Sequence, residues 1–284
     1  MRAFKPVATE PSFFITIILI MSLIIACSSD ETEERGEISE GESQQALEQQ
    51  RPKFTDAGLA DPGYEGWKQY FDEFVIVYFP PDSALQERVP AIATTIKRVV
   101  MENAYRLHVR PPTPFVFYLY NNTTEVEQLT DCSNTCVRGN VIHYMTLTPL
   151  GQPIMIRLLP EFDPDGTPYK FVYEGIVTLL DYSRRNYVQR AYIDLYNGEL
   201  PSMATLLEND EYMAVDSATR VQAAASFLQY LTQPPWAPDS VLSLYKSDKA
   251  PDQALLDIFG RTPQDLEEGW HEYLRENSGL DVEY

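Results

Sequence analysis

The chain has 284 residues, of which 44% are hydrophobic and 23% are charged, enough apolar material for one sizeable globular core or two small ones. This composition excludes collagen, coiled-coil and fully disordered proteins. Lys and Arg total 22 against 42 Asp and Glu, a formal net charge of −20, so phosphate backbones would repel the protein and we expect no nucleic-acid partner. With only 3 His and 3 Cys, the composition also disfavours a metalloenzyme.

The first 26 residues have the organisation of a bacterial lipoprotein signal peptide. Arg2 and Lys5 precede an apolar run over 13–26, which is shorter than the roughly 20 residues needed to span a bilayer. The run ends in Ile-Ile-Ala before Cys27, which resembles a lipobox, so we expect cleavage before Cys27 and acylation of its thiol, with palmitate among the acyl chains. The alternative is a short transmembrane anchor with a buried Cys27, against which the following acidic tract argues.

The lipobox predicts a bacterial cell-envelope protein held at the membrane by its lipid anchor. Ser28, rather than Asp, at the second mature position favours the outer membrane. Residues 27–66 are expected to form an acidic, disordered tether with a reach on the order of 30 Å, and 67–284 to form the folded domain. An acidic docking tail is the alternative for the tether, but charge runs are usually just solvated.

Strand and helix signals alternate at the start of the folded domain. Residues 74–79 and 115–120 are β-branched and aromatic runs bounded by Pro, typical of strands, and apolar residues between them at helical spacing predict a helix over 83–107. Pro90 fits the first turn of that helix. A short helix is expected at 123–130 and a third strand within 137–148, giving the order β, α, β, α, β.

The rest of the chain is predicted to be mainly helical. Residues 169–185 and 217–231 each have apolar residues along one helix face. Thr262, Pro263 and Asp265 predict the start of the last helix as N-cap, first helical residue and near capping box. Strands first and helices after predict an α+β fold, with a small strand-helix subdomain followed by a helical subdomain.

Three motifs occur in order in the helical half. They are Glu174-Gly175 within 173–181, Ser226-Phe227 within 223–231, and the Gly-x-Thr…Leu…Trp pattern of 260–270. Their order and spacing resemble the peptidase MA-like gluzincins, a group of zinc metallopeptidases, over roughly residues 70–276. In that family a His-Glu-x-x-His helix supplies two zinc ligands and the Glu of a later Glu-Gly helix supplies the third. The resemblance therefore implies a zincin-like helical subdomain and places Glu174 at the third ligand position.

The family's zinc site is incomplete in this sequence. The resemblance places the His-Glu-x-x-His helix on 151–161, which contains no histidine, so Glu174 becomes a vestigial ligand position and we expect no metal or other cofactor. His271 begins a similar pattern, but Arg275 stands where the second imidazole belongs, so we expect His271 to be a solvent-facing helix residue. His108 is expected at a helix end.

Other groupings are weaker. Cys132 and Cys136 form an even pair once Cys27 is lipidated, and we expect a local disulfide. Residues 163–166 favour a tight turn over a calcium loop. Four carboxylates could supply acid-base pairs that sequence alone cannot assign: Glu174, Asp181, Asp194 and Glu199.

The function predicted is therefore that of a non-catalytic envelope lipoprotein, a pseudo-metallopeptidase that binds a peptide or an envelope protein partner. Tyrosines cluster around the expected cleft helix, where they would supply contact area: Tyr169, Tyr173, Tyr182, Tyr187, Tyr192 and Tyr196. His143, Tyr173 and Asp181 are the candidate cleft residues. The alternative is an envelope hydrolase with an atypical site around Glu174 and His143.

Overall fold

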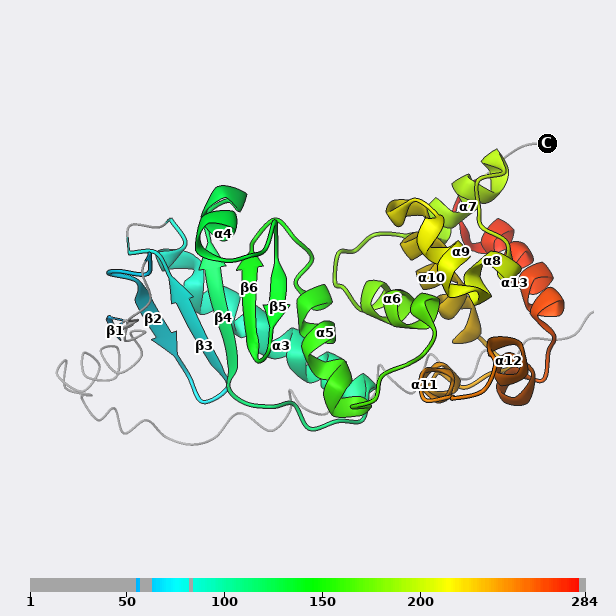
Figure 1. The fold of residues 1–284 in the computed structure, drawn as a ribbon, viewed down its shortest axis with the longest axis horizontal. Helices are drawn as coiled ribbons and strands as arrows, with labels where there is room; N and C mark the ends of the chain where they lie inside the picture. The colour runs from blue at the N-terminus through cyan, green and yellow to red at the C-terminus, as the bar shows by residue number, and fades with distance from the viewer. Residues whose placement is uncertain (1–54, 57–62, 82–83, 281–284) are drawn as a thin grey trace, which may run out of the picture. The chain divides into compact units, whose positions relative to one another are not determined.

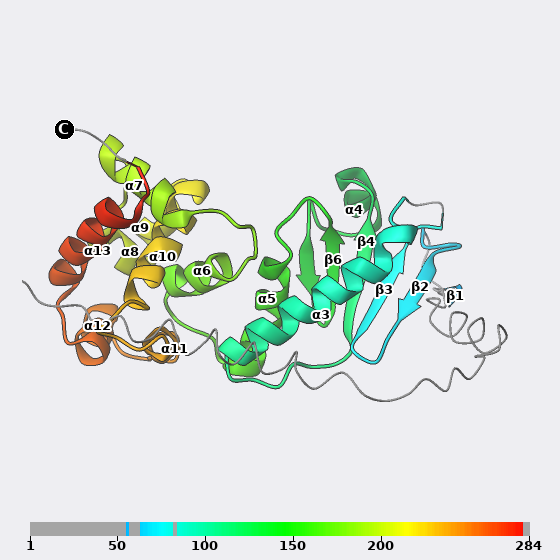
Figure 2. The same cartoon turned by 180° about the vertical axis from the view of Figure 1, so that it is seen from behind.

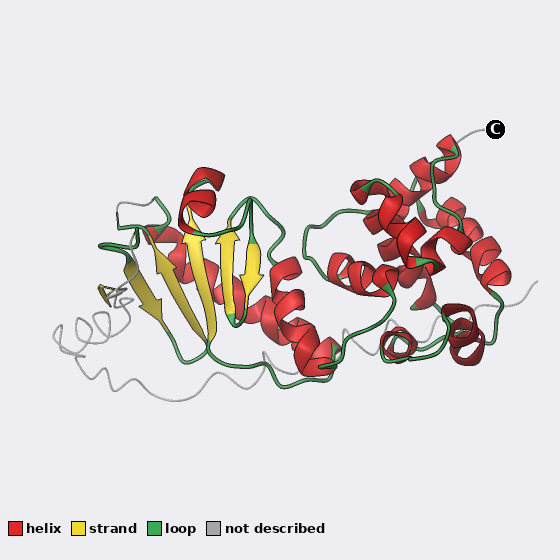
Figure 3. Cartoon of the chain, in the orientation of Figure 1, coloured by secondary structure: helices red, strands yellow, loops and turns green. Residues whose placement is uncertain are grey.

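The protein is α+β, with the strands preceding most of the helices, as predicted (Figures 1 and 3). A computed structural model describes residues 55–56, 63–81 and 84–280. The predicted signal peptide, the predicted lipidation site Cys27 and most of the predicted tether lie outside the described residues. Over the described residues, no helix is both long enough and apolar enough to cross a bilayer.

The strand region is one six-stranded mixed sheet with the order β1-β2-β3-β4-β6-β5. The central strands β3 (Val75–Phe79), β4 (Phe115–Tyr120) and β6 (Val141–Met145) run parallel to one another. The outer strands pair antiparallel to their neighbours; they are β1 (Thr55–Asp56), β2 (Lys68–Phe71) and β5 (Cys136–Arg138). Parallel neighbours need crossover connections, and these contain the helices α3 and α4.

Alternating side chains give the sheet one large buried face. Val75, Val77 and Phe79 are fully buried on β3, and Phe115, Phe117 and Leu119 are their counterparts on β4. The helix α3 (Val89–Arg106) runs across this face, as Figure 2 shows, after a short 3-10 turn at Gln86–Arg88. The opposite face carries a smaller aromatic core that includes Tyr64, Trp67 and Tyr120, next to α4 (Thr123–Leu129).

The helix α5 (Gly151–Phe162) connects the sheet to the helical region. It contacts β5, β6 and α3 as well as α6. The backbone N–H of Gly151 donates to the Asp181 carbonyl, and a side chain at this position would collide with the backbone of residues 180–181. The glycine therefore lets the start of α5 lie against the end of α6.

The helical region forms one core with the inner face of the sheet. Its remaining helices are α6 (Lys170–Leu179), α7 (Tyr187–Asn197), α8 (Met203–Leu207), α9 (Asn209–Ala214), α10 (Ser217–Leu231), α11 (Asp239–Tyr245), α12 (Pro251–Phe259) and α13 (Pro263–Asn277). The most extensive packing joins α6 to α10. The capping box predicted at Thr262 and Asp265 is present at the start of α13.

The structure differs from the sequence analysis, or adds to it, at three points. The strand expected within 137–148 is present as β6, but it forms a hairpin with the unpredicted strand β5, because Gly139 adopts a left-handed φ of 57° and turns the chain between them. Within the range predicted as tether, Thr55–Asp56 forms the strand β1, which pairs with β2. The helix expected over 169–185 ends at Leu179, where the chain turns through a left-handed Tyr182.

Candidate functional site

The predicted ligand position, Glu174, lies on α6 where this helix packs closely on α10. Gly175 makes this approach possible, since a Cβ at that position would lie 3.1 Å from the Ala224 carbonyl oxygen and 2.7 Å from Leu228. The Glu-Gly pair thus has a packing role, and the side chain of Glu174 is directed toward partners on α9 and α10.

Both carboxylate oxygens of Glu174 are engaged by protein groups. Arg220 donates from Nε to Oε2 at 2.9 Å and from Nη2 to Oε1 at 3.2 Å, and the Tyr212 hydroxyl donates to Oε2 at 2.9 Å. The exposed fractions of the Glu174 and Arg220 side chains are 22% and 15%. The hydrogen bond that Arg220 donates to Glu174 raises the pKa of Arg220, and burial, followed by the charge of Glu174, raises the pKa of Tyr212. This bidentate ion pair links α6 to α10 and has a structural role.

The surrounding residues do not fit a zinc centre. On α5, where the family resemblance places the two imidazoles, the inward positions are apolar and include Ile154, Met155 and Leu158. Glu161 instead pairs with Arg157 one turn away, at 2.9 Å. Among the described residues, no group of three or more His, Cys, Asp and Glu is arranged to hold a metal ion. Glu174 could accept zinc only by giving up Arg220.

His143 belongs to the aromatic core on the other face of the sheet. Its Nδ1 lies 2.7 Å from the Tyr120 hydroxyl, and its ring packs against those of Tyr118 and Tyr120. Burial, followed by the charge of Arg138, lowers the pKa of His143. His143 and Glu174 share no hydrogen-bond partner, so the structure does not unite them in one site.

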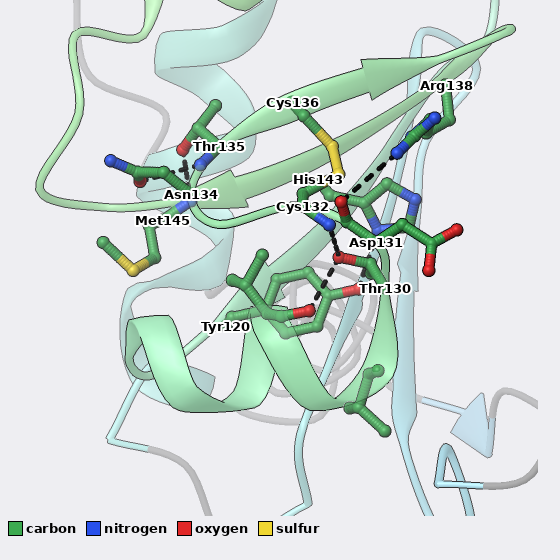
Figure 4. Close-up of a disulfide and its surroundings, with 12 residues drawn as sticks. Tyr120, Thr130, Asp131, Cys132, Asn134, Thr135, Cys136, Arg138, His143 and Met145 are labelled. Atoms are coloured by element: carbon green, nitrogen blue, oxygen red, sulfur yellow. Dashed lines mark hydrogen bonds between the residues drawn. A yellow bond between two sulfur atoms is a disulfide. The ribbon is translucent and has the colours of Figure 1, made fainter.

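The predicted disulfide joins Cys132 and Cys136, whose Cα atoms are 6.2 Å apart. Figure 4 shows it beside His143, and Cys136 is the register partner of His143 across the hairpin. The Thr130 hydroxyl accepts from the Cys132 N–H at 3.1 Å, so the loop is also held by its own hydrogen bonds. The disulfide therefore fastens the loop between α4 and β5.

The other two histidines have structural surroundings. His108 follows the end of α3 as predicted, with its Nε2 3.2 Å from the exposed Asp239 carboxylate. The expectation that His271 faces solvent is wrong: its ring packs against Trp270, the side chain is partly buried, and burial lowers its pKa.

The predicted tyrosine cluster does not form one surface. Tyr169, Tyr187 and Tyr192 are buried in the core, whereas Tyr196 is 65% exposed. Tyr173 lines a small pocket beside residues 163–166, which form the predicted tight turn with the Gly166 N–H donating to the Asp163 carbonyl.

Among the four candidate carboxylates, Asp194 and Glu199 are near each other. Burial, followed by the charge of Glu199, raises the pKa of Asp194. Asp181 and Glu174 each have separate hydrogen-bond partners. The sequence therefore identified residues that the structure distributes over three places.

A cavity with a volume of about 730 Å³ lies where α3, α6 and α10 end and α11 begins. The loop over 180–187 forms one wall, and Asp181 is the only one of the predicted cleft residues that lines it. This volume is within the range of small-ligand sites.

Asp181 holds the cavity loop in place. The carboxylate of this buried residue accepts from the Ser183 N–H at 2.7 Å and from the Tyr187 hydroxyl at 2.5 Å. Burial, with the hydrogen bond to Asp181 second, raises the pKa of Tyr187 to about 12. Asp181 is therefore an anchor for the loop, with its oxygens already used.

Backbone strain is concentrated around this cavity. Within the described part of the chain, the non-glycine residues with positive φ are His108 (55°), Tyr182 (61°) and Arg184 (59°), and all of them line the cavity. The Tyr182 hydroxyl is also buried without a hydrogen-bond partner among the described residues. Such strain persists only where the surroundings enforce it, and it gathers at functional sites. Sequence reasoning missed this site because Tyr182 and Arg184 are residue types that carry no signal for a left-handed backbone.

Comparisons with protein families, with curated proteins and with solved structures found no match. The resemblance to the gluzincins remains a prediction from the three motifs.

Proposed function

We propose that this chain is a lipid-anchored protein of the bacterial envelope that binds a peptide segment of a partner without hydrolysing it. The cavity at the ends of α3, α6 and α10 is the binding site in this proposal. The lipid anchor on Cys27 would hold the protein at the membrane, in the outer membrane if Ser28 acts as the sorting residue.

The observation that carries the non-catalytic part is the pairing of Glu174 with Arg220. A metallopeptidase needs a carboxylate free to bind the metal, two imidazoles and a general base on the bound water. Here the carboxylate has a permanent cationic partner on both oxygens, and α5 presents apolar side chains. A hydrolase built from Glu174 and His143 has less support, because each residue is committed to a different core.

The binding part rests on the contrast between the cavity and the rest of the fold. The cavity is large enough for one or two side chains, and its walls combine apolar groups with unused polar ones. Strained residues line it on two sides. Preorganised concave surfaces of this kind favour binding of an extended segment, because the protein loses little conformational entropy when the segment binds.

The purified mature chain tests the non-catalytic part directly. We expect well under one zinc per chain by mass spectrometry, no shift in melting temperature on chelation, and no cleavage of unfolded protein or fluorogenic peptides with or without added zinc. About one zinc per chain that is lost in Glu174→Gln would overturn the proposal.

The anchor is tested in cells. The wild type should incorporate labelled palmitate and partition into detergent, whereas Cys27→Ala should remain an unlabelled precursor. An unlabelled wild type would contradict the lipid anchor.

A further inference from the structure

Three arginines line the cavity without an ion-pair partner among the described residues. Arg106 is the last residue of α3, and Arg184 and Arg185 lie in the loop that Asp181 anchors. All are exposed, and none takes part in an ion pair found among the described residues. Each guanidinium therefore presents a planar set of N–H donors with no protein acceptor.

The carboxylates of the cavity are already engaged. Asp181 accepts from Tyr187 and from the Ser183 N–H, and Asp239 lies against His108. With two Asp against three Arg, the ionised lining has a formal charge of +1, in a chain whose net charge is −20. The hydrogen-bonding groups left without a partner at this cavity are therefore cationic donors, and these suit an anionic ligand.

Helix ends explain only part of this arrangement. The carboxyl ends of α3 and α6 carry partial negative charge, so a cation near either end is favourable. A single cation at a helix end is enough for this interaction with the helix dipole. It does not require Arg184 to hold a left-handed φ of 59° in a loop beyond α6. A loop shaped to bind a ligand gives a direct reason for the strained backbone of Arg184.

The walls below the arginines are apolar. Leu107 and Val241 are buried, and the remaining aliphatic lining consists of Ile176, Leu179, Leu180 and Leu242. A ligand that matches both parts has an apolar group to enter the cavity and a carboxylate to meet the guanidinium groups in a bidentate manner.

We propose that the cavity binds a peptide through an apolar side chain and a neighbouring carboxylate, with the carboxylate held by Arg184 and Arg185. The inference rests on the proposed peptide-binding function and gives it a ligand class. The carboxylate can be the free C-terminus of the peptide or the side chain of an Asp or Glu next to the apolar residue, because both present the same pair of oxygens.

The test uses the mature full-length protein in detergent and three libraries of short random peptides. The first has free C-termini and no Asp or Glu, the second has amidated C-termini with Asp and Glu, and the third has amidated C-termini without either residue. Binding is measured by fluorescence anisotropy, and hydrogen exchange locates the protected residues. We expect binders from the first or second library that are at least about tenfold tighter than any from the third, with protection of residues 180–187.

A charge-matched pair of variants ties the effect to the cavity. Arg184→Gln/Arg185→Gln should weaken binding of the selected peptides by about tenfold or more. Arg98→Gln/Arg190→Gln removes the same charge from exposed positions outside the cavity and should leave binding within about twofold. Far-UV circular dichroism and melting curves check that both double variants fold.

The outcomes separate the two proposals. Equal binding of the third library, or equal loss in both double variants, overturns the carboxylate inference and leaves peptide binding standing. Absence of binding from all three libraries overturns peptide binding itself, and the inference with it. Preference for the first library identifies the C-terminus as the carboxylate source, and preference for the second identifies an acidic side chain.

Discussion

The surroundings of Glu174 and the cavity at the end of α6 lie on the same helix and differ in how their polar groups are used. Around Glu174 each carboxylate oxygen has a partner, and the helices approach so closely that only glycine fits at Gly175. Around the cavity, residues with left-handed backbones occur together with a buried hydroxyl and guanidinium groups that have no partner in the part of the chain that the structure describes.

This difference indicates where to look for function. Fully satisfied polar groups in a packed interface contribute stability, and changing them should unfold the protein before it changes anything else. Strained and unsatisfied groups cost stability, and proteins retain them mainly at sites that bind or react. The position that the family resemblance marks as a zinc ligand thus has a structural role, and the cavity has the features expected of a binding site.

The largest effect is expected from removing the partner of Glu174. Arg220→Ala leaves a mostly buried carboxylate without its cation, and we expect a loss of about 2–3 kcal/mol in the free energy of unfolding, measured in urea. Arg157→Ala, which breaks the more exposed pair with Glu161, should cost less than about 1 kcal/mol. Equal losses of stability in the two variants would show that the Glu174–Arg220 ion pair does not stabilise the packing of α6 on α10.

Close packing of α6 on α10 gives the next effect. Gly175→Ala places a methyl group against the Ala224 backbone and Leu228, and we expect a destabilisation of about 1–3 kcal/mol. Gly269→Ala, also within a helix, meets only the end of the Tyr230 side chain, which can move, so its cost should be smaller. If Gly175→Ala is neutral or stabilising, α6 and α10 are less tightly packed than the structure shows.

At the cavity, by contrast, we expect a substitution to increase the free energy of unfolding. Arg184→Gly relieves a left-handed backbone, and we expect a gain of up to about 1 kcal/mol in stability together with weaker peptide binding. The neighbouring Arg185 does not have a positive φ, so Arg185→Gly should lower stability by about 0.5–1 kcal/mol. Thermal and urea unfolding of both variants measure the difference. A stability loss in Arg184→Gly would argue that the strain at this position is not significant.

Sequence reasoning found the parts of this molecule that depend on local signals. The strands at 75–79 and 115–120 follow from β-branched and aromatic runs, and the start of α13 follows from its capping box. The strands β1, β2 and β5 and the helices α7, α8, α9, α11 and α12 were not predicted. Most of these elements are short, and their stability comes from tertiary packing rather than from local propensity.

The candidate site was less predictable for a related reason. The Glu174–Arg220 pair links residues far apart in sequence and exists only once α6 and α10 pack. The cavity depends on the left-handed backbones of His108, Tyr182 and Arg184, and Tyr and Arg adopt this region only rarely. Composition and periodicity carry no information on either feature, so both needed three-dimensional structure.

The smallest expected effect is on the pH dependence of stability and concerns His143, which lies outside both the surroundings of Glu174 and the cavity. Because burial lowers its pKa in the folded protein, the unfolded chain binds the proton more readily below the ordinary pKa of about 6.5. Its contribution to stability is therefore complete above that pH and is lost as the pH falls through the folded-state value. Urea unfolding of the wild type at about pH 7, 6 and 5 should show this decline, and His143→Gln, which keeps an acceptor for Tyr120, should make it shallower.

His271→Gln is the matched control, because burial lowers the pKa of His271 in the same direction from a different core. Each variant should remove part of the pH dependence, and neither should change zinc content or peptide binding. A pH dependence that is the same in wild type and His143→Gln would contradict the burial argument. If His143→Gln instead abolished a hydrolytic activity, His143 would act with a reacting group, and the assignment of function to the cavity alone would fail.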